Sequence, residues 1–342
     1  MSAVRAAVAP ATTPRPRAAS RLLVWQGARS EARPFDEIAR ALRPTDLVVV
    51  NDSGTFPASL RGKDSLGRDL ELRLASPPDV AGEAVGVLFG AGDHRTRTED
   101  RSPPPPVAPN AELRFGELHA SVVSLLDHPR LVRVRFDERG SALFRALYTQ
   151  GRPVQYAYVP EPLALWDVQN VYAGPAVSAE LPSAGYAISF AVLESLRAKG
   201  VRVVALTHAA GLSSTGDAAL DARLPLPERY SIPDATASAV RDALAAGGRV
   251  VAVGTSVVRA LEASALSGVT NGITDLRIDA SHRLRVVSAI LTGVHAPGES
   301  HYDLLEAFLP RRELDAAFTR SAELGLLGHE FGDAILFERA RR

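Results

Sequence analysis

Short runs of apolar residues, each followed by a polar turn, recur near the start of the chain and throughout its second half. Runs that are apolar at every position are typical of strands that are buried on both faces of a sheet, as in a parallel sheet covered by helices. We predict strands at these runs: Leu22–Trp25, Leu47–Val50, Val201–Leu206, Val250–Val253, Leu284–Leu291 and Ile335–Phe337.

Helical spacing of apolar residues separates these strands, and some of the predicted helices have recognisable ends. Ser189 is a suitable N-cap for a helix that continues to Lys199 and ends at Gly200. Asp234 is suited to cap a helix that ends at Gly247. The alternation of strand and helix predicts an α/β fold with a mostly parallel sheet. Further helices are predicted at Phe35–Leu42, Ser300–Leu309 and Glu313–Leu324.

Residues 57–149 follow a different pattern, in which apolar and polar positions alternate. Leu70, Leu72 and Leu74 are separated by polar neighbours, and Leu131–Phe136 alternates in the same way. The proline run Pro103–Pro106 is unsuited to a central strand. This pattern predicts a small all-β domain at residues 57–149, inserted into a large α/β domain formed by residues 20–56 and 150–342.

The first 19 residues are rich in Ala, Pro, Thr and Arg and include no acidic residue. This composition predicts a disordered leader at residues 1–19, with a targeting peptide as the alternative. The segment lacks the apolar stretch of a secretory signal, and the chain contains no apolar run of membrane-spanning length. We therefore expect a cytoplasmic protein with no membrane partner.

Composition excludes several kinds of site. The chain has no cysteine, so disulfides, thiolate metal sites and cysteine nucleophiles are excluded. Its eight histidines do not have zinc-ligand spacing, so we expect no metal. The 39 basic and 39 acidic residues balance, which leaves a local basic face as the remaining route to nucleic-acid binding.

Polar side chains gather where the predicted strands end. Ligands of open α/β sheets bind beyond the carboxyl ends of the strands, where helix N-termini point outward. We predict the ligand site around four turns: Asn51–Thr55, Thr207–Ser214, Gly254–Arg259 and Thr292–Ser300.

The turn that begins at Gly254 has two interpretations. It can be a plain helix start in which Arg259 and Glu262 form an exposed ion pair three residues apart. It can instead bind an anion or a ribose, with hydroxyl groups from Thr255 and Ser256, while Arg259 neutralises a carboxylate or phosphate.

Two histidines and two carboxylates are the candidates for proton transfer. His208 and His295 follow two predicted strands, and each is either a structural residue or a site residue. If their strands are adjacent, the two can converge on one pocket. Asp52 and Glu228 are the best-placed general bases, although Asp52 can equally cap its own turn.

Taken in order, the motifs of the chain resemble the S-adenosylmethionine:tRNA ribosyltransferase-isomerase family of queuosine biosynthesis. The resemblance extends from about Ser20 to the C-terminus. It is carried by these segments and positions: Ala19–Val24, Leu47–Asp52, Pro57–Ala58, Gln169–Ala173, Pro182–Gly185, Arg197–Val201, Val250–Thr255, Val258–Arg259, Leu261–Glu262, Thr274–Leu276, Arg285–Val287, Leu291–Thr292, His295, Pro297 and Gly332–Ala334.

The resemblance implies a large α/β domain that carries a small antiparallel β-barrel. It implies a metal-free reaction in which the ribosyl portion of S-adenosylmethionine, as substrate, moves to 7-aminomethyl-7-deazaguanine in tRNA. The sequence leaves the oligomeric state open, with a monomer as the favoured state. The expected catalytic residues are Asp52, His208, Glu228 and His295, and the expected substrate-binding residues are Asn51, Ser183, Thr255, Ser256, Arg259 and Thr292.

The chain departs from the family pattern at several strand ends. Gly54 stands in place of an arginine, and Ala187 in place of a histidine. In a family stretch rich in histidine, only Glu228 is retained. Two alternatives therefore stay open: a diverged paralogue that uses S-adenosylmethionine or another nucleoside on a small-molecule acceptor, and a non-catalytic relative.

Overall fold

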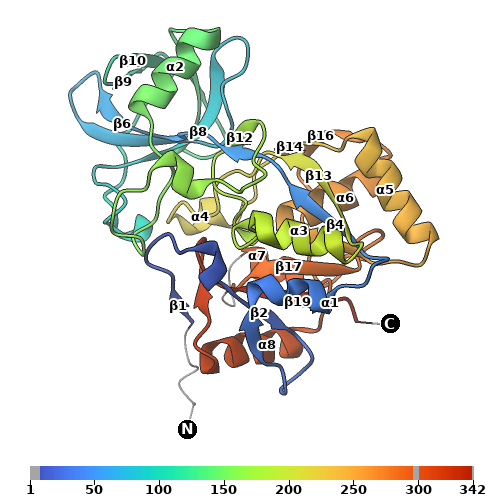
Figure 1. Ribbon diagram of the computed structural model, residues 1–342. Coiled ribbons are helices and arrows are strands. Elements are labelled where there is room, and N and C mark those ends of the chain that lie inside the picture. The colour runs from blue at the N-terminus through green and yellow to red at the C-terminus, as the bar shows by residue number, and fades with distance from the viewer. Residues whose placement is uncertain (1–7, 296–299, 341–342) are drawn as a thin grey trace.

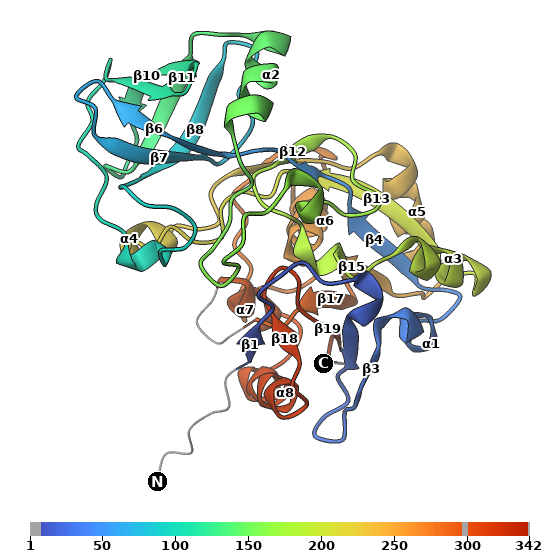
Figure 2. The ribbon, with the colours of Figure 1, turned by 60° about the vertical axis from the view of Figure 1, so that its left-hand side comes forward.

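The computed structural model describes residues 8–295 and 300–340, which form a large sheet domain and a closed β-barrel. The barrel projects from one end of the sheet domain, to which two chain segments connect it (Figures 1 and 2). The predicted combination of an α/β domain and a small antiparallel barrel is confirmed.

The large sheet of the described chain has nine strands, and its centre is parallel. The pairs β13–β4, β4–β15 and β15–β17 are parallel, whereas antiparallel pairs lie on both flanks. In order across the sheet, the strands are β16 (Asn271–Thr274), β14 (Glu228–Ser231), β13 (Arg202–His208), β4 (Leu47–Asn51), β15 (Val250–Val253), β17 (Ala289–Gly293), β19 (Ala334–Glu338), β2 (Arg21–Val24) and β3 (Ala32–Pro34).

Successive residues of the central strands face two separate cores, which explains why these strands are apolar throughout. In β4, Val49 packs in one core, whereas Val48 and Val50 pack in the other. The first core is covered by α5 (Asp234–Ala245), α6 (Thr255–Ser267), α7 (Ser300–Leu305) and α8 (Arg311–Glu323), and the second by α1 (Ile38–Ala41) and α3 (Phe190–Ala198).

Helix α3 begins as predicted, because the side chain of Ser189 accepts a hydrogen bond from the backbone N–H of Val192.

The barrel encloses a core of its own, in which Leu60, Leu72 and Val134 are fully buried. Helix α2 (Gly140–Gln150) lies against it (Figure 1), with Leu143 and Leu147 in the same core. The strands are β6 (Ser59–Asp64), β7 (Asp69–Leu74), β8 (Glu83–Phe89), β9 (Glu112–Phe115), β10 (Leu118–Leu125) and β11 (Leu131–Phe136).

Residues 9–19 are ordered, contrary to the predicted disordered leader; residues 1–7 lie outside the described residues. Strand β1 (Ala9–Pro10) pairs with β18 (Leu327–Gly328). The guanidinium of Arg17 donates to the backbone oxygens of Tyr186 and, at 2.6 Å, of Gln169. Composition missed this order because Arg15 and Arg17 bind groups that are distant in sequence, namely the Asp333 carboxylate and these two backbone oxygens.

The predicted strand Leu284–Leu291 is wrong in its first half, since β17 begins only at Ala289. The reason is Glu262, whose buried carboxylate accepts the backbone N–H groups of Arg285, Val286 and Val287 at 2.8–3.0 Å. These N–H groups are therefore satisfied by a side chain of α6 rather than by a neighbouring strand.

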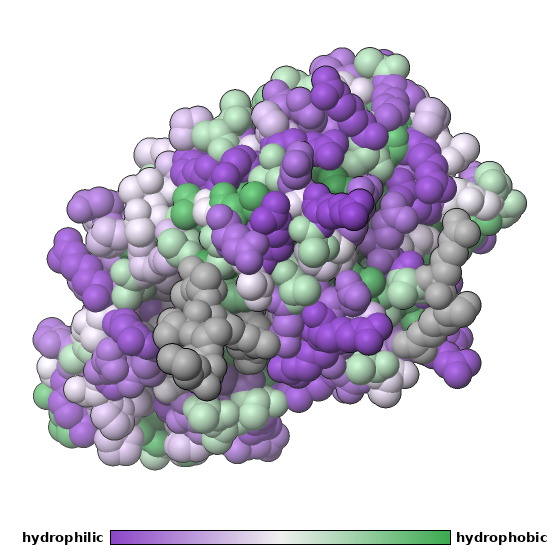
Figure 3. All heavy atoms as spheres, turned by 90° about the horizontal axis from the view of Figure 1, so that it is seen from below, coloured by the Kyte–Doolittle hydropathy of each residue, from purple (hydrophilic) through white to green (hydrophobic). Residues whose placement is uncertain are grey.

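Short elements complete the described chain: β5 (Gly54–Thr55), β12 (Ala176–Ser178), α4 (Ala218–Asp221), and the 3-10 turns at Arg17–Ala19, Phe35–Glu37, Thr98–Asp100, Leu165–Val168 and Ser183–Gly185. The face seen in Figure 3 is mainly hydrophilic, with apolar groups scattered between polar ones. None of the described helices is long and apolar enough to cross a membrane.

Candidate functional site

Asn51, the last residue of β4, joins two of the turns that the sequence predicted to form the site. Its amide nitrogen donates to the backbone oxygen of His208 at 2.8 Å and to the hydroxyl of Ser256 at 3.2 Å. Its amide oxygen accepts the backbone N–H of His208 at 2.9 Å. Asn51 therefore holds the end of β13 and the start of α6 together at the carboxyl edge of the sheet.

A buried chain of polar side chains lies beside Asn51. The Nε2 atom of His208 lies 2.7 Å from the Oε2 atom of Glu228, and Arg259 contacts the same oxygen. Burial would raise the pKa of the Glu228 carboxyl, but the hydrogen bond from His208 and the charge of Arg259 hold that pKa down, at about 2. Glu228 is therefore ionised and accepts a hydrogen from His208.

The alternative of an exposed Arg259–Glu262 ion pair is wrong. Both side chains are buried, and each has a different partner. Arg259 contacts Glu228 and donates to the backbone oxygen of Leu276 at 3.0 Å, while Glu262 binds the backbone N–H groups before β17. Periodicity cannot show this difference, because the partners are 15 or more residues away in sequence.

Asp52 stands at the solvent side of this network and is half-buried. Its Oδ1 atom accepts the hydroxyl of Thr207 at 2.6 Å. Burial raises the pKa of the neighbouring Tyr172 hydroxyl, and the negative charge of Asp52 adds to that effect. Asp52 is thus a half-buried acceptor that is held in place by β13.

The N-terminus of α6 is shaped by Gly254, whose φ is 90°. A Cβ atom at this position would lie 3.1 Å from the Cβ of Ala184, so the turn at Ser183–Gly185 packs directly against the helix start. Thr255, Ser256 and Ser183 are half-buried around this contact. Hydroxyl groups and free backbone N–H groups at a helix N-terminus suit a polar or anionic ligand.

Thr292 lies at the same edge, near the end of β17, but His295 does not join the His208 network. Thr292 is buried, and its hydroxyl has no hydrogen-bond partner among the described residues. The condition for the two histidines to converge is not met, because β4 and β15 lie between β13 and β17. His295 instead stacks on His301, with ring centroids 4.8 Å apart.

Residues 296–299, including Pro297 of the resemblance, lie outside the described residues.

Two of the departures from the family pattern, Gly54 and Ala187, lie at positions that are packed within the fold. Gly54 lies in β5, where an added Cβ would meet the backbone oxygen of Gly174 at 3.2 Å and the side chain of Gln169 at 3.3 Å. Ala187 is buried in the core beneath α1 and α3. Both positions are packed by the chain itself, so neither contributes a polar group to the site.

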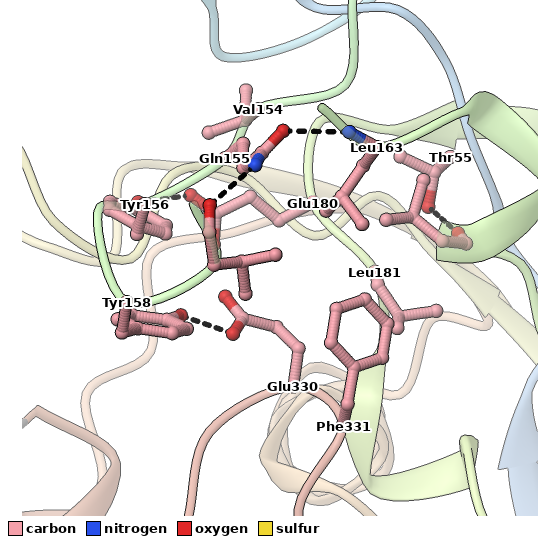
Figure 4. A pocket seen from close by; sticks show the side chains of 12 residues that line it. Thr55, Val154, Gln155, Tyr156, Tyr158, Leu163, Glu180, Leu181, Glu330 and Phe331 are labelled. Carbon is pink, nitrogen blue, oxygen red and sulfur yellow. Dashed lines mark hydrogen bonds between the residues drawn. The ribbon is translucent and has the colours of Figure 1, made fainter. Parts of the chain in front are cut away.

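A narrow cavity borders this region and contains residues that sequence reasoning missed (Figure 4). We call it the tyrosine cavity; it is lined by Thr55, Val154, Gln155, Tyr156, Tyr158, Val159, Leu163, Val168, Glu180, Leu181, Glu330 and Phe331. None of the predicted site residues belongs to this described lining. Thr55, however, lies three residues after Asp52, and Leu181 lies two residues before Ser183.

The tyrosine cavity has an acid that can titrate near neutral pH. Burial raises the pKa of the Glu180 carboxyl to about 7, although the hydroxyl of Tyr156, at 2.6 Å, and the backbone N–H of Ser213 donate to it. Opposite it, the hydroxyl of Tyr158 donates to Glu330 (Figure 4). The segments that supply these residues have no periodic pattern or motif, so no sequence signal marked them.

Groups of three or more side chains suited to a metal ion do not occur within the described ranges.

Comparison with known proteins gives a consistent result. A family model described as a queuosine biosynthesis protein matches residues 3–337. The S-adenosylmethionine:tRNA ribosyltransferase-isomerase of Anaeromyxobacter dehalogenans strain 2CP-C is 34% identical over 337 residues, which cover 95% of this chain and 94% of that protein. The protein of the same name from Acaryochloris marina is 31% identical and covers 94% of this chain and 88% of its own length.

A solved structure shares the fold. The crystal structure of an S-adenosylmethionine tRNA ribosyltransferase from Thermotoga maritima has a TM-score of 0.50 and 24% sequence identity. The match covers 97% of this chain and 96% of that one, so both domains are included.

Proposed function

The chain belongs to the queuosine biosynthesis protein family, and from this premise we propose that it is an S-adenosylmethionine:tRNA ribosyltransferase-isomerase. In this role it would move the ribosyl portion of S-adenosylmethionine to 7-aminomethyl-7-deazaguanine in tRNA. The observation that carries the proposal is the hydrogen-bonded chain from Ser256 through Asn51 to His208 and Glu228, which joins residues from four elements at the carboxyl edge of the sheet.

The half-buried hydroxyl groups of Ser183, Thr255 and Ser256 are suited to bind S-adenosylmethionine. Ribose hydroxyls and the carboxylate of the methionine portion both pair with such groups and with the free N–H groups of α6. Asn51 positions Ser256 through a 3.2 Å hydrogen bond. We assign Thr292, whose buried hydroxyl has no described partner, to the same substrate-binding set.

We assign the general base to Asp52. The sulfonium of S-adenosylmethionine acidifies the neighbouring ribose carbon, so a carboxylate at contact distance can remove its proton. The electron pair left on this carbon allows the C–N bond between the ribosyl group and adenine to break. The aminomethyl nitrogen of the deazaguanine then forms the new bond to the ribosyl group and loses a proton, and a ribosyl oxygen displaces methionine from its carbon as the epoxide closes. Asp52 suits this step because it is half-buried and is oriented by Thr207.

His208, Glu228 and Arg259 are too deeply buried to touch a substrate in this conformation. We assign them a positioning role, in which they hold the ends of β13, β14 and α6 beneath the ligand. This replaces the expectation that Arg259 clamps the substrate directly. His295 lies apart from them and is the candidate for contact with the acceptor.

The test uses purified protein, S-adenosylmethionine and tRNA that contains 7-aminomethyl-7-deazaguanine. Release of adenine and methionine in equal amounts, together with epoxide in the tRNA, is the expected result. A folded sample that binds S-adenosylmethionine and releases neither product with this tRNA contradicts the proposal.

A further inference from the structure

A hollow with arginine side chains around it lies at the far end of α6 from the candidate site. Its volume is about 360 Å³, and it is lined by Leu266, Arg277, Asp279, Ser281, His282, Arg283 and Arg285. We call it the arginine hollow. Arg277, Arg283 and Arg285 are exposed. One nitrogen of the Arg277 guanidinium donates to the backbone oxygen of Ala222 at 3.0 Å, and its other N–H groups face the hollow's solvent together with Arg283 and Arg285.

The charges of the arginine hollow do not cancel within it. The one carboxylate of its described lining, Asp279, already accepts the backbone N–H and the hydroxyl of Ser281 at 2.8 and 2.6 Å. His282 faces inward, where its Nε2 atom lies 3.6 Å from the buried carboxylate of Glu262. Three arginines thus gather at one place in a chain whose formal net charge is zero.

Helix α6 fixes the arginine hollow relative to the candidate site. Arg259, which contacts Glu228 in the site, donates to the backbone oxygen of Leu276 at 3.0 Å. One turn further along the helix, Glu262 accepts the backbone N–H of Arg285 at 2.8 Å. Both ends of the arginine-bearing segment are therefore held by the helix whose first turn forms the site.

We propose that the arginine hollow binds phosphate groups of the RNA backbone. This inference rests on the proposed function. Guanidinium groups form paired hydrogen bonds to phosphate oxygens and stay charged at all physiological pH values. With a rise of about 1.5 Å per residue, Leu266 lies roughly 17 Å along α6 from Thr255. At about 3.4 Å per nucleotide along one strand, this distance corresponds to about five nucleotides. An RNA whose target base enters the site can therefore reach the hollow with its backbone.

The test measures binding of an unmodified tRNA transcript to the full-length protein between 50 and 200 mM salt. The variant combines Arg283→Ala and Arg285→Ala, whose side chains have no hydrogen bond or ion pair to any residue that the structure describes. Each phosphate that is no longer neutralised lowers the slope of log affinity against log salt by about 0.7 for a single strand. The double variant should therefore show a slope smaller by about 1.4 and bind tRNA about tenfold more weakly at 50 mM salt.

Three controls make the outcome decisive. Arg241→Ala, on the exposed side of α5, should leave the slope unchanged. Arg283→Lys with Arg285→Lys retains the charge and should retain most of the slope. Calorimetric binding of S-adenosylmethionine and the melting temperature report whether the fold and the candidate site of each variant are intact.

The proposal is overturned if the double alanine variant binds tRNA with the wild-type slope and affinity, or if inorganic phosphate binds the hollow while tRNA binding is unaffected. In either case, release of adenine and methionine by the wild type with tRNA that contains 7-aminomethyl-7-deazaguanine would show that the proposed function stands without the arginine hollow. If the wild type does not bind the unmodified transcript at 50 mM salt, the proposal for the arginine hollow fails, and product release from tRNA that contains 7-aminomethyl-7-deazaguanine decides the proposed function separately.

Discussion

The Nε2 atom of His208 lies 2.7 Å from the Oε2 atom of Glu228, and both side chains are buried at the carboxyl edge of the sheet. The two residues lie on neighbouring antiparallel strands, β13 and β14. Arg259 approaches the same carboxylate oxygen from α6. The ionised carboxyl group of Glu228 therefore joins β14 to β13 and α6.

Glu228→Gln removes that charge and leaves the Arg259 guanidinium buried beside a neutral amide. Loss of one partner of a buried ion pair costs about 3 kcal/mol or more in the free energy of unfolding. We expect a loss of about 3 kcal/mol in urea denaturation. The matched control is Glu194→Gln at an exposed position of α3, which should change stability by less than about 0.5 kcal/mol. Equal effects of the two substitutions would contradict the role given to Glu228.

The same carboxyl group predicts how stability depends on acid. Its pKa is lowered from 4.5 to about 2 on folding, so the folded state favours the ionised form. The stabilisation is complete above the unfolded pKa and is lost as pH falls from about 4.5 to 2. The difference in unfolding free energy between the wild type and Glu228→Gln should therefore shrink as pH falls through this range. A constant difference would show that Glu228 does not titrate as described.

Glu180 in the tyrosine cavity predicts the opposite trend. Burial raises its pKa from 4.5 to about 7, so the folded state favours the protonated form, and ionisation destabilises the fold as pH rises through this range. Glu180→Gln keeps an oxygen that can accept from Tyr156 and removes the titration. We expect the variant to gain stability relative to the wild type between pH 5 and pH 8, as measured by thermal unfolding. A gain that is the same at both pH values would argue against a titrating Glu180.

Asp52→Asn tests the proposed base. The amide oxygen can still accept the hydroxyl of Thr207, so binding of S-adenosylmethionine should change by only a few-fold. The rate of adenine release should fall by about 10²–10⁴, the usual contribution of a general base. Asp36→Asn, at an exposed position in the same half of the chain, serves as the control. A variant that retains the wild-type rate would remove Asp52 from the mechanism.

Gly254→Ala tests the contact between the start of α6 and the turn at Ser183–Gly185. The added Cβ is strained at φ 90° and would lie 3.1 Å from the Cβ of Ala184. Gly268→Ala, at the other end of the same helix, has φ 77° and meets nothing within 4 Å. Both variants should lose about 1 kcal/mol to backbone strain. Only Gly254→Ala should also weaken binding of S-adenosylmethionine, as calorimetry would show; equal affinities would place the ligand elsewhere.

Much of the fold could be predicted because the cause is local. Val250–Val253 forms a strand at its predicted bounds, since a run of small apolar residues is satisfied on both faces of a covered sheet. Ser189 caps α3 because its side chain reaches the N–H of Val192, three residues away. The strand predicted at Leu284–Leu291 was wrong in its first half because a distant side chain, Glu262, binds that backbone.

The sequence alone determined the class of fold, the approximate positions of its central strands and helices, the polar turns at their ends and the resemblance to a family, because spacing and motif order are properties of consecutive residues. Only the tertiary structure decided which polar residues meet. His208 pairs with Glu228 rather than converging with His295, because the order of strands across the sheet brings β14 beside β13 and places β4 and β15 between the two histidines. Local periodicity does not encode that order, and hydrogen bonds of about 3 Å depend on it.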